Sequence, residues 1–149
     1  MPGRGSLSSV GDLTPEEWER MLALNLSGVY YCCHEILPIF RKDAAGGDVI
    51  NISSLAGANA FAGGAGYNAT KFGLNGFSEA MMMDHRKEGV RVSYIMPGSV
   101  DTEFGGGSKG AEWKVAPEDI ADVVVTLLRM PRRTTVSRVE IRPSMPPGK

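Results

Sequence analysis

The sequence predicts an α/β fold with three layers, in which a parallel β-sheet carries helices on both of its faces. Helical patterns alternate along the chain with three short apolar segments of strand character. Strands that are separated in sequence by helices pair in parallel and are covered by those helices. No internal repeat or low-complexity domain interrupts the alternation. We therefore expect the 149 residues to form one domain.

The first predicted helix follows the cap residue Thr14, and Glu17 completes a T-x-x-E capping box. Apolar residues continue at helical spacing to about residue 40. Asn25 and Gly28 lie in the middle of this long helix, and both residue types are poor helix formers. The sequence therefore predicts a local distortion near the centre of the helix.

The remaining elements follow from short apolar runs, turn residues and amphipathic spacing. In chain order they are a buried strand in GDVINISS (47–54), a helix over about 67–87, a strand in RVSYIM (91–96), a helix over 117–129 and a strand in SRVEIRP (137–143). Pro131 ends the last helix, because proline cannot continue it. The core of the domain is expected over 14–143, between a loop at 1–13 and a tail at 144–149.

The composition excludes several classes of function. The net charge is −1 and the arginines are scattered, so we expect neither nucleic acid nor a membrane surface as a partner. No apolar run is long enough to cross a bilayer. The two cysteines are adjacent, which gives neither a disulfide framework nor a metal-binding spacing. No apolar core marks the first residues as a secretion signal, so we expect a cytoplasmic protein without a metal site.

Tyr67 and Lys71 form the most informative chemical pair. They are four residues apart, so on a helix they lie on one face, one turn from each other. A phenol ordinarily titrates near 10, which is too high for proton exchange at neutral pH. A positive charge at ~4 Å is worth about 4 kcal/mol at an intermediate dielectric and would lower the pKa of the phenol. The pair could therefore supply a general acid or base.

Two further segments lie where open parallel sheets place ligands, at the carboxyl ends of strands. Ser54 ends the first predicted strand, and its hydroxyl either orients a substrate oxygen or satisfies a turn. The segment PGSVDT (97–102) follows the second strand directly. Its Pro97-Gly98 step forces a turn and allows a backbone to approach a ligand closely.

Together these motifs resemble the short-chain dehydrogenase/reductase family. The resemblance rests on LNLSGVY in the first helix, INISSLAG at a strand end, YNATKFGLNGFS and IMPGSVDT, in this order and spacing. It extends from about Leu13 to Pro143. It implies a Rossmann-like domain and an oxidoreductase that moves hydride between NAD or NADP and a small alcohol or ketone.

The resemblance also implies a role for each motif residue. Tyr67 would be the general acid or base, Lys71 would lower its pKa and bind the nicotinamide ribose, and Ser54 would hold the substrate oxygen. Asn25 would hold a water that continues the proton path. Pro97, Gly98, Val100 and Thr102 would line the nicotinamide side. A mobile substrate lid is expected over 103–115, and a homo-oligomer through the helices near 15–41 and 67–87.

The resemblance covers the carboxy-terminal catalytic portion of the family, truncated on the N-terminal side. The glycine-rich phosphate loop should precede the matched motifs, so we expect this chain to hold only the nicotinamide end of the cofactor. The missing half would lie beside the VINISS strand, leaving that edge of the sheet unpaired. GGGSKG (105–110) matches G-x-G-x-x-G literally, but no strand leads into it and no helix opens there.

Two alternatives to an active oxidoreductase remain open. The chain could be a catalytically inactive, truncated relative that acts as an oligomerising or ligand-holding module through its long helices. Serine hydrolysis at Ser54 is the weaker alternative, because G-x-S-x-G is absent and neither histidine fits a Ser–His–acid order. Cofactor binding would discriminate between the first alternative and an enzyme.

Overall fold

The computed structural model describes residues 7–104 and 110–146. Every predicted helix and strand is present, in the predicted order. The elements are α1 (Pro15–Leu22), η1 (Ala23–Ser27), α2 (Gly28–Phe40), β1 (Gly47–Ile52), η2 (Leu55–Gly57), α3 (Ala65–His85), η3 (Arg86–Glu88), β2 (Val90–Pro97), α4 (Pro117–Arg129) and β3 (Arg138–Ile141).

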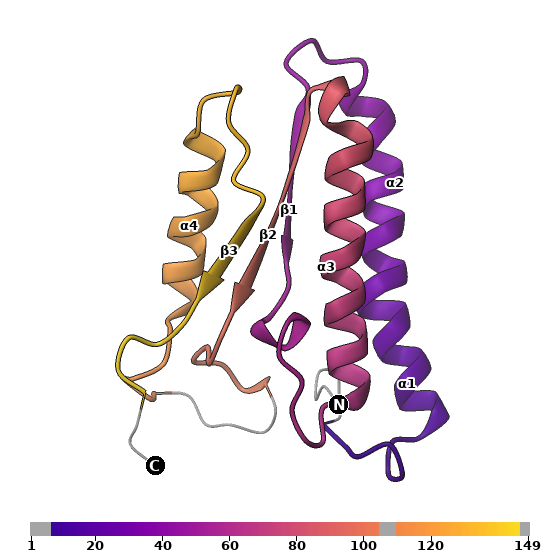
Figure 1. Cartoon of the computed structure of the whole chain (residues 1–149), viewed down its shortest axis with the longest axis vertical. Helices are drawn as coiled ribbons and strands as arrows, with labels where there is room; N and C mark the ends of the chain where they lie inside the picture. Colours follow the sequence, from indigo (N-terminus) through magenta and orange to yellow (C-terminus); the bar gives the residue numbers. More distant parts are fainter. Residues whose placement is uncertain (1–6, 105–109, 147–149) are drawn as a thin grey trace.

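The three strands form one parallel sheet in the order β1-β2-β3. Gly47 lies opposite Val90, and Tyr94 lies opposite Arg138. Figure 1 shows α2 and α3 together on one side of the sheet and α4 on the other. The predicted α/β class, with helices on both faces of a parallel sheet, is therefore confirmed.

The main core lies between β2 and the helices α2 and α3. Cys33 from α2 and Met81 from α3 pack against Val90 and Val92 of β2. The alternation of side chains along a strand sends Arg91 to the opposite face, toward the end of α4. Every residue of β2 is buried, as expected for the middle strand of a covered sheet. This rigid centre fixes the positions of the loops that follow the strands.

The predicted distortion of the first helix is confirmed, and it takes the form of a π-helical turn. The chain runs from α1 through the π segment η1 into α2, so the single long helix of the prediction becomes three segments. Asn25 lies inside η1. A π turn inserts one extra residue and rotates the helix surface, and such turns are frequent at functional sites.

Two boundaries differ from those expected. α3 begins at Ala65, two residues before Tyr67, because Gly64 can precede the first turn without a side-chain cap. The loop of small residues before α3 contains the short 3-10 helix η2, which Ser54 caps. Both differences bring the loop after β1 closer to the start of α3.

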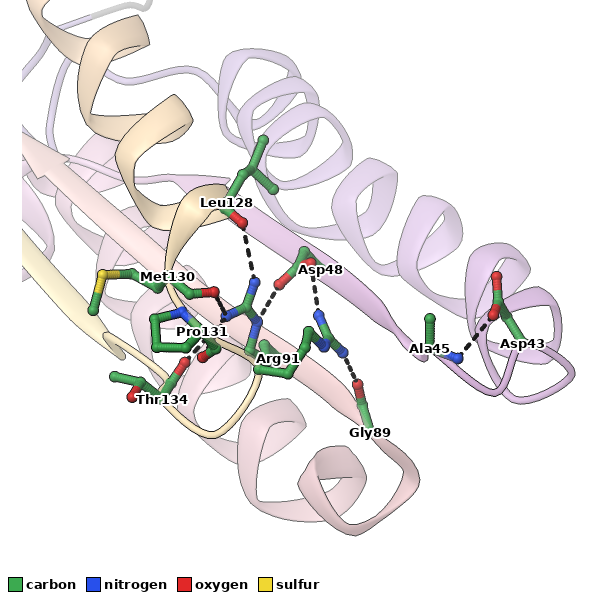
Figure 2. A network of polar contacts seen from close by, with 10 residues as sticks. Asp43, Ala45, Asp48, Gly89, Arg91, Leu128, Met130, Pro131 and Thr134 are labelled. Atoms are coloured by element: carbon green, nitrogen blue, oxygen red, sulfur yellow. Dashed lines mark hydrogen bonds and ion pairs between the residues drawn. The ribbon is translucent and has the colours of Figure 1, made fainter.

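The amino-terminal ends of the strands are joined to the end of α4 by a polar network (Figure 2). Arg91 donates to Asp48 at 2.6 Å and to the backbone carbonyls of Met130 and Thr134 at 2.8 and 3.2 Å. Arg132 also binds Asp48, at 2.9 Å. The sequence had indicated only scattered arginines, and this network is a structural feature that it did not predict.

Candidate active site

A cavity of about 1620 Å³ opens at the carboxyl ends of the three strands. It brings together residues from the π segment, the loop after β1, the first turns of α3 and the segment after β2. All the residues that the sequence singled out line it: Asn25, Ser54, Tyr67, Lys71, Pro97, Gly98, Val100 and Thr102. The topology rule for open parallel sheets accounts for this position.

Ser54 satisfies a turn, which is one of the two roles considered for it from the sequence, and its role toward a substrate oxygen stays a prediction. Its Oγ accepts a hydrogen bond from the amide of Ala56 at 3.1 Å, which caps η2. Its hydroxyl also interacts with the phenol of Tyr67. The turn therefore fixes the hydroxyl at the cavity wall beside the candidate catalytic tyrosine.

Tyr67 and Lys71 lie on one face of α3 and point into the cavity. The Nζ of Lys71 donates to the carbonyl oxygen of Ile52, the last residue of β1, at 3.2 Å. The same Nζ lies 5.7 Å from the centroid of the Tyr67 ring. The strand end thus anchors the ammonium beside the aromatic ring.

The expected lowering of the phenol pKa by Lys71 is not found in this arrangement. Burial raises the pKa of Tyr67, and the hydrogen bond with Ser54 opposes the rise. Burial also lowers the pKa of Lys71. The physical reason is that the site removes both groups from water, which disfavours the charged form of each, while the ammonium is held at the Ile52 carbonyl.

Asn25 reaches α3 through a residue that the sequence analysis did not single out. Its Nδ2 donates to Oγ1 of Thr70 at 3.1 Å, and that hydroxyl donates to the backbone carbonyl of Tyr67 at 2.9 Å. Thr70 is fully buried. The π turn thereby connects Asn25 to the backbone of the candidate catalytic residue.

Two buried asparagines of α3 hold the loop that carries Ser54. Asn68 donates to the carbonyls of Ala56 and Asn59 at 2.7 and 3.0 Å. Asn75 donates to the carbonyl of Gly57 at 3.0 Å and accepts from the hydroxyl of Ser53 at 2.5 Å. The sequence analysis missed both, because the carbonyls that they bind belong to a loop that only the fold brings beside α3.

The turn after β2 packs closely against its neighbours. The amide of Gly98 donates to the carbonyl of Ile141 at 2.7 Å. A Cβ at Gly98 would lie 3.0 Å from Cδ1 of Leu55 and 3.2 Å from the Ile141 oxygen. The turn expected at the Pro97-Gly98 step is present, and its close approach to a ligand stays a prediction.

The described ends of the predicted lid are tied to the site. The ring of Phe104 packs on that of Tyr67, with 5.0 Å between the centroids. The carboxylate of Asp101 accepts from the amides of Gly110 at 2.8 Å and Ala111 at 3.3 Å. Residues 105–109, which include most of the GGGSKG run, lie outside the described residues. The mobility of the lid stays a prediction.

Comparison with known proteins agrees with the geometry. A family described as short chain dehydrogenase matches residues 3–112. The chain belongs to the short-chain dehydrogenase family. An uncharacterized oxidoreductase of Staphylococcus saprophyticus is 32% identical over 137 residues, covering 91% of this chain and 58% of that protein. One of Staphylococcus epidermidis is 32% identical over 95% of this chain and 61% of its own length.

Solved short-chain dehydrogenase structures superpose on nearly the whole chain. An alcohol dehydrogenase from the archaeon Thermococcus sibiricus, complexed with 5-hydroxy-NADP, has a TM-score of 0.86 at 26% identity, over 99% of this chain and 63% of that one. A serine dehydrogenase complexed with NADP+ has a TM-score of 0.83 at 30% identity, over 92% and 60%. This short-chain dehydrogenase chain therefore spans about three fifths of the length of the relatives it matches.

Within residues 7–104 and 110–146, no group of three or more His, Cys, Asp and Glu side chains is placed to hold a metal ion. Across the same described part of the chain, none of the helices has the length and apolar character needed to cross a bilayer.

Proposed function

We propose that this protein is an NAD(P)-dependent oxidoreductase that transfers hydride between a nicotinamide cofactor and a small alcohol or ketone. The observation that carries the proposal is the convergence of Ser54, Tyr67 and Lys71 on one cavity at the carboxyl ends of parallel strands. Their hydroxyl, phenol and ammonium groups are those that proton transfer to a carbonyl oxygen requires. The NADP bound in related structures supports the same cofactor class.

The residues of the cavity fit the nicotinamide end of the cofactor. Pro97 and Gly98 form a turn at the cavity wall, and the missing side chain of Gly98 lets this turn pack against Leu55 and the carbonyl of Ile141. Lys71 offers ammonium donors to a ribose hydroxyl, alongside Tyr67. The holding residues would be Tyr67, Lys71, Pro97, Gly98, Val100 and Thr102. When bound, the nicotinamide supplies or accepts the hydride.

The side chains of the chain itself handle the substrate oxygen and its proton. Ser54 donates a hydrogen bond to that oxygen and orients it. Tyr67 gives a proton to the oxygen when a ketone is reduced, and takes one when an alcohol is oxidised. Because burial raises the pKa of Tyr67, its phenol keeps its proton at neutral pH, which suits the acid role in ketone reduction and disfavours the phenolate that alcohol oxidation needs. Asn25 holds a water that continues the proton path.

We also propose a cytoplasmic homo-oligomer that contacts through the long helices. Large apolar side chains are exposed on α2 and α3, among them Tyr31 at 62% and Met83 at 64%. Large apolar side chains that a single chain leaves exposed are candidates for burial in an interface. The proposed partner is therefore a second copy of the same chain, docked on the face formed by α2 and α3.

A second candidate is a catalytically inactive relative that serves as an oligomerising or ligand-holding module. The specific observation in its favour is the sheet of the described residues, in which β1 pairs on one side only. The pyrophosphate of a dinucleotide ordinarily binds to the half of the fold that would continue this sheet. A chain that holds only the nicotinamide end would bind the cofactor weakly.

The test is a titration of the purified chain with NADH and NADPH, followed by nicotinamide fluorescence and calorimetry. Saturable binding, with ketone reduction that falls at least about 100-fold in Tyr67→Phe and Lys71→Ala, is the result expected of the enzyme. Absence of binding up to millimolar cofactor would rule out an autonomous enzyme and favour the module.

A further inference from the structure

The charges around the cavity are segregated by sign. Four cationic side chains line it, and no carboxylate side chain of the described residues does: the cations are Arg20, Lys71, Lys114 and Arg142. The whole chain has a net charge of −1, so this excess of positive charge is local to the cavity. A cleft lined by one sign of charge concentrates ligands of the opposite sign.

Two of these cations flank the turn that follows β2. Gly98 is bonded to the carbonyl of Ile141, whose next residue is Arg142. Ser99 accepts from the amide of Val115 at 3.0 Å, and the preceding residue is Lys114. Lys114 and Arg142 therefore belong to one end of the cavity, beside the segment after β2 and β3. Arg20 belongs to a different wall, formed by α1.

The topology places the end of the cavity that holds Lys114 and Arg142 away from the expected binding site for the phosphates of a dinucleotide. α2 leads into β1 and α3 leads from β1 to β2, and both helices lie on the same face of the sheet (Figure 1). Because parallel crossovers are right-handed, a strand preceding α1 would pair at the free edge of β1. The phosphate-binding half of the fold would extend the sheet there, on the side opposite to β3.

The local surroundings leave Lys114 available for an anion. Its Nζ lies 5.9 Å from the centroid of the Trp113 ring, and none of the described carboxylates forms an ion pair with it. Arg142 donates to Glu140 at 2.6 Å through one nitrogen, which leaves other guanidinium donors for a ligand. The aromatic rings of Phe104 and Trp113 also line the cavity and offer apolar surface beside these cations.

We propose that the substrate carries a carboxylate, held by Lys114 with support from Arg142, and that its apolar part lies against Phe104 and Trp113. The substrate class is then hydroxy and oxo acids, in preference to neutral alcohols and ketones. The inference rests on the proposed function, because it names the substrate of the same site. It assigns Lys114 as the residue that decides this preference.

The test uses Trp113 as an internal reporter and needs no cofactor. The chain has two tryptophans, so Trp18→Phe leaves the indole beside Lys114 as the sole one. This variant is titrated with β-hydroxybutyrate, with the methyl ester of the same acid as the neutral comparison, and with inorganic phosphate. We expect a saturable fluorescence change with the acid, at least about 10-fold weaker binding of the ester, and weaker binding of phosphate than of the acid.

Lys114→Gln keeps a polar side chain that is one atom shorter and removes the charge, so it should weaken binding of the acid at least about 10-fold. Lys87→Gln, at an exposed lysine of η3 outside the cavity, is the matched control and should leave binding unchanged. Equal binding of acid and ester, or equal binding by the Lys114→Gln variant, would overturn the inference. Tighter binding of phosphate than of the acid would overturn the carboxylate assignment.

These measurements distinguish a failure of the carboxylate subsite from a failure of the proposed oxidoreductase function. Binding of β-hydroxybutyrate that depends on Lys114, in a chain that binds neither NADH nor NADPH, would support the acid subsite and reject the autonomous enzyme. Cofactor binding with reduction of neutral ketones, and with no response to the acid, would support the enzyme and reject the subsite.

Discussion

The phenol of Tyr67 is under two opposing influences, and they can be separated experimentally. Burial raises its pKa, and the hydrogen bond with Ser54 lowers it. Ser54→Ala removes only the second influence, so the pKa of Tyr67 should rise further above its ordinary value. Titration of phenolate absorbance would measure this, with Tyr67→Phe used to subtract the other tyrosines. An unchanged or lower pKa in Ser54→Ala would contradict the contact.

The raised pKa of Tyr67 makes the stability of the folded chain depend on pH. The folded-state pKa of Tyr67 is raised above the unfolded value of about 10. Its contribution to the free energy of unfolding is therefore fully present below that pH and is lost as the pH rises through the folded pKa. The Tyr67→Phe variant lacks this titrating group, so its free energy of unfolding should fall less as the pH rises through the alkaline range.

At the residue scale, the sequence predicted the chemical groups better than their surroundings. Tyr67, Lys71 and Ser54 were found from residue type and spacing, and all three reach the cavity. The direction of the Tyr67 pKa was wrong, because spacing along a helix does not show how far a phenol is removed from water. Asn68 and Thr70 were missed, because their importance depends on backbone carbonyls brought near by the fold.

At the scale of elements, the π turn η1 joins the first helix to α3 through one hydrogen-bonded chain. Asn25 donates to the hydroxyl of Thr70, which in turn binds the carbonyl of Tyr67. Thr70→Val and Asn25→Ala should each lower the free energy of unfolding by about 1–3 kcal/mol, because each leaves a polar group without its partner. In the double variant the losses should fall short of their sum by at least about 0.5 kcal/mol. Urea unfolding measures this coupling, and simple additivity would count against the contact.

The polar network in Figure 2 joins α4 to the sheet through Arg91. The side chain of Arg91 is only 8% exposed and is bonded to Asp48. Arg91→Met removes the buried partner of that carboxylate, leaving it only the exposed Arg132, and leaves several carbonyls without this donor, so the free energy of unfolding should fall by about 3–5 kcal/mol. Arg132→Gln is the matched control, because Arg132 binds the same carboxylate from a side chain that is 45% exposed.

The control should cost no more than about 1 kcal/mol, because exposed ion pairs contribute little. Denaturant unfolding of both variants measures the difference. Similar losses for the two arginines would show that burial does not set the strength of the Asp48 interactions.

The elements themselves were predicted well for a physical reason. Capping residues, proline positions and apolar periodicity are local signals, and they placed α1, α4 and the strands close to their observed bounds. The type of the distortion near Asn25 was not predictable, because a poor helix former does not specify a π turn. The network around Arg91 was equally hidden, because its partners come from two segments far away in the sequence, at Asp48 and at 128–134.

At the scale of the whole molecule, two surfaces compete as sites of association. One is the face of α2 and α3 that carries exposed apolar side chains, and the other is the edge of β1 that has no partner strand among the described residues. The amides of Gly47 and Ser53 donate to β2. Since successive residues of a parallel strand point to alternate sides, the amides of Ile50 and Ile52 point away from β2. An unpaired edge of this kind is a template for another strand.

We expect association through the helix face, because that face offers the large side chains that stabilise a specific interface. Sedimentation should show oligomers whose population rises with protein concentration, and Tyr31→Glu should shift them toward monomers. Under the same conditions, NMR-detected hydrogen exchange at Ile50 and Ile52 should stay fast at every concentration. If their exchange instead slows as the oligomer forms, while Tyr31→Glu leaves the oligomer intact, the strands of two copies pair at β1 and the helix face is not the interface.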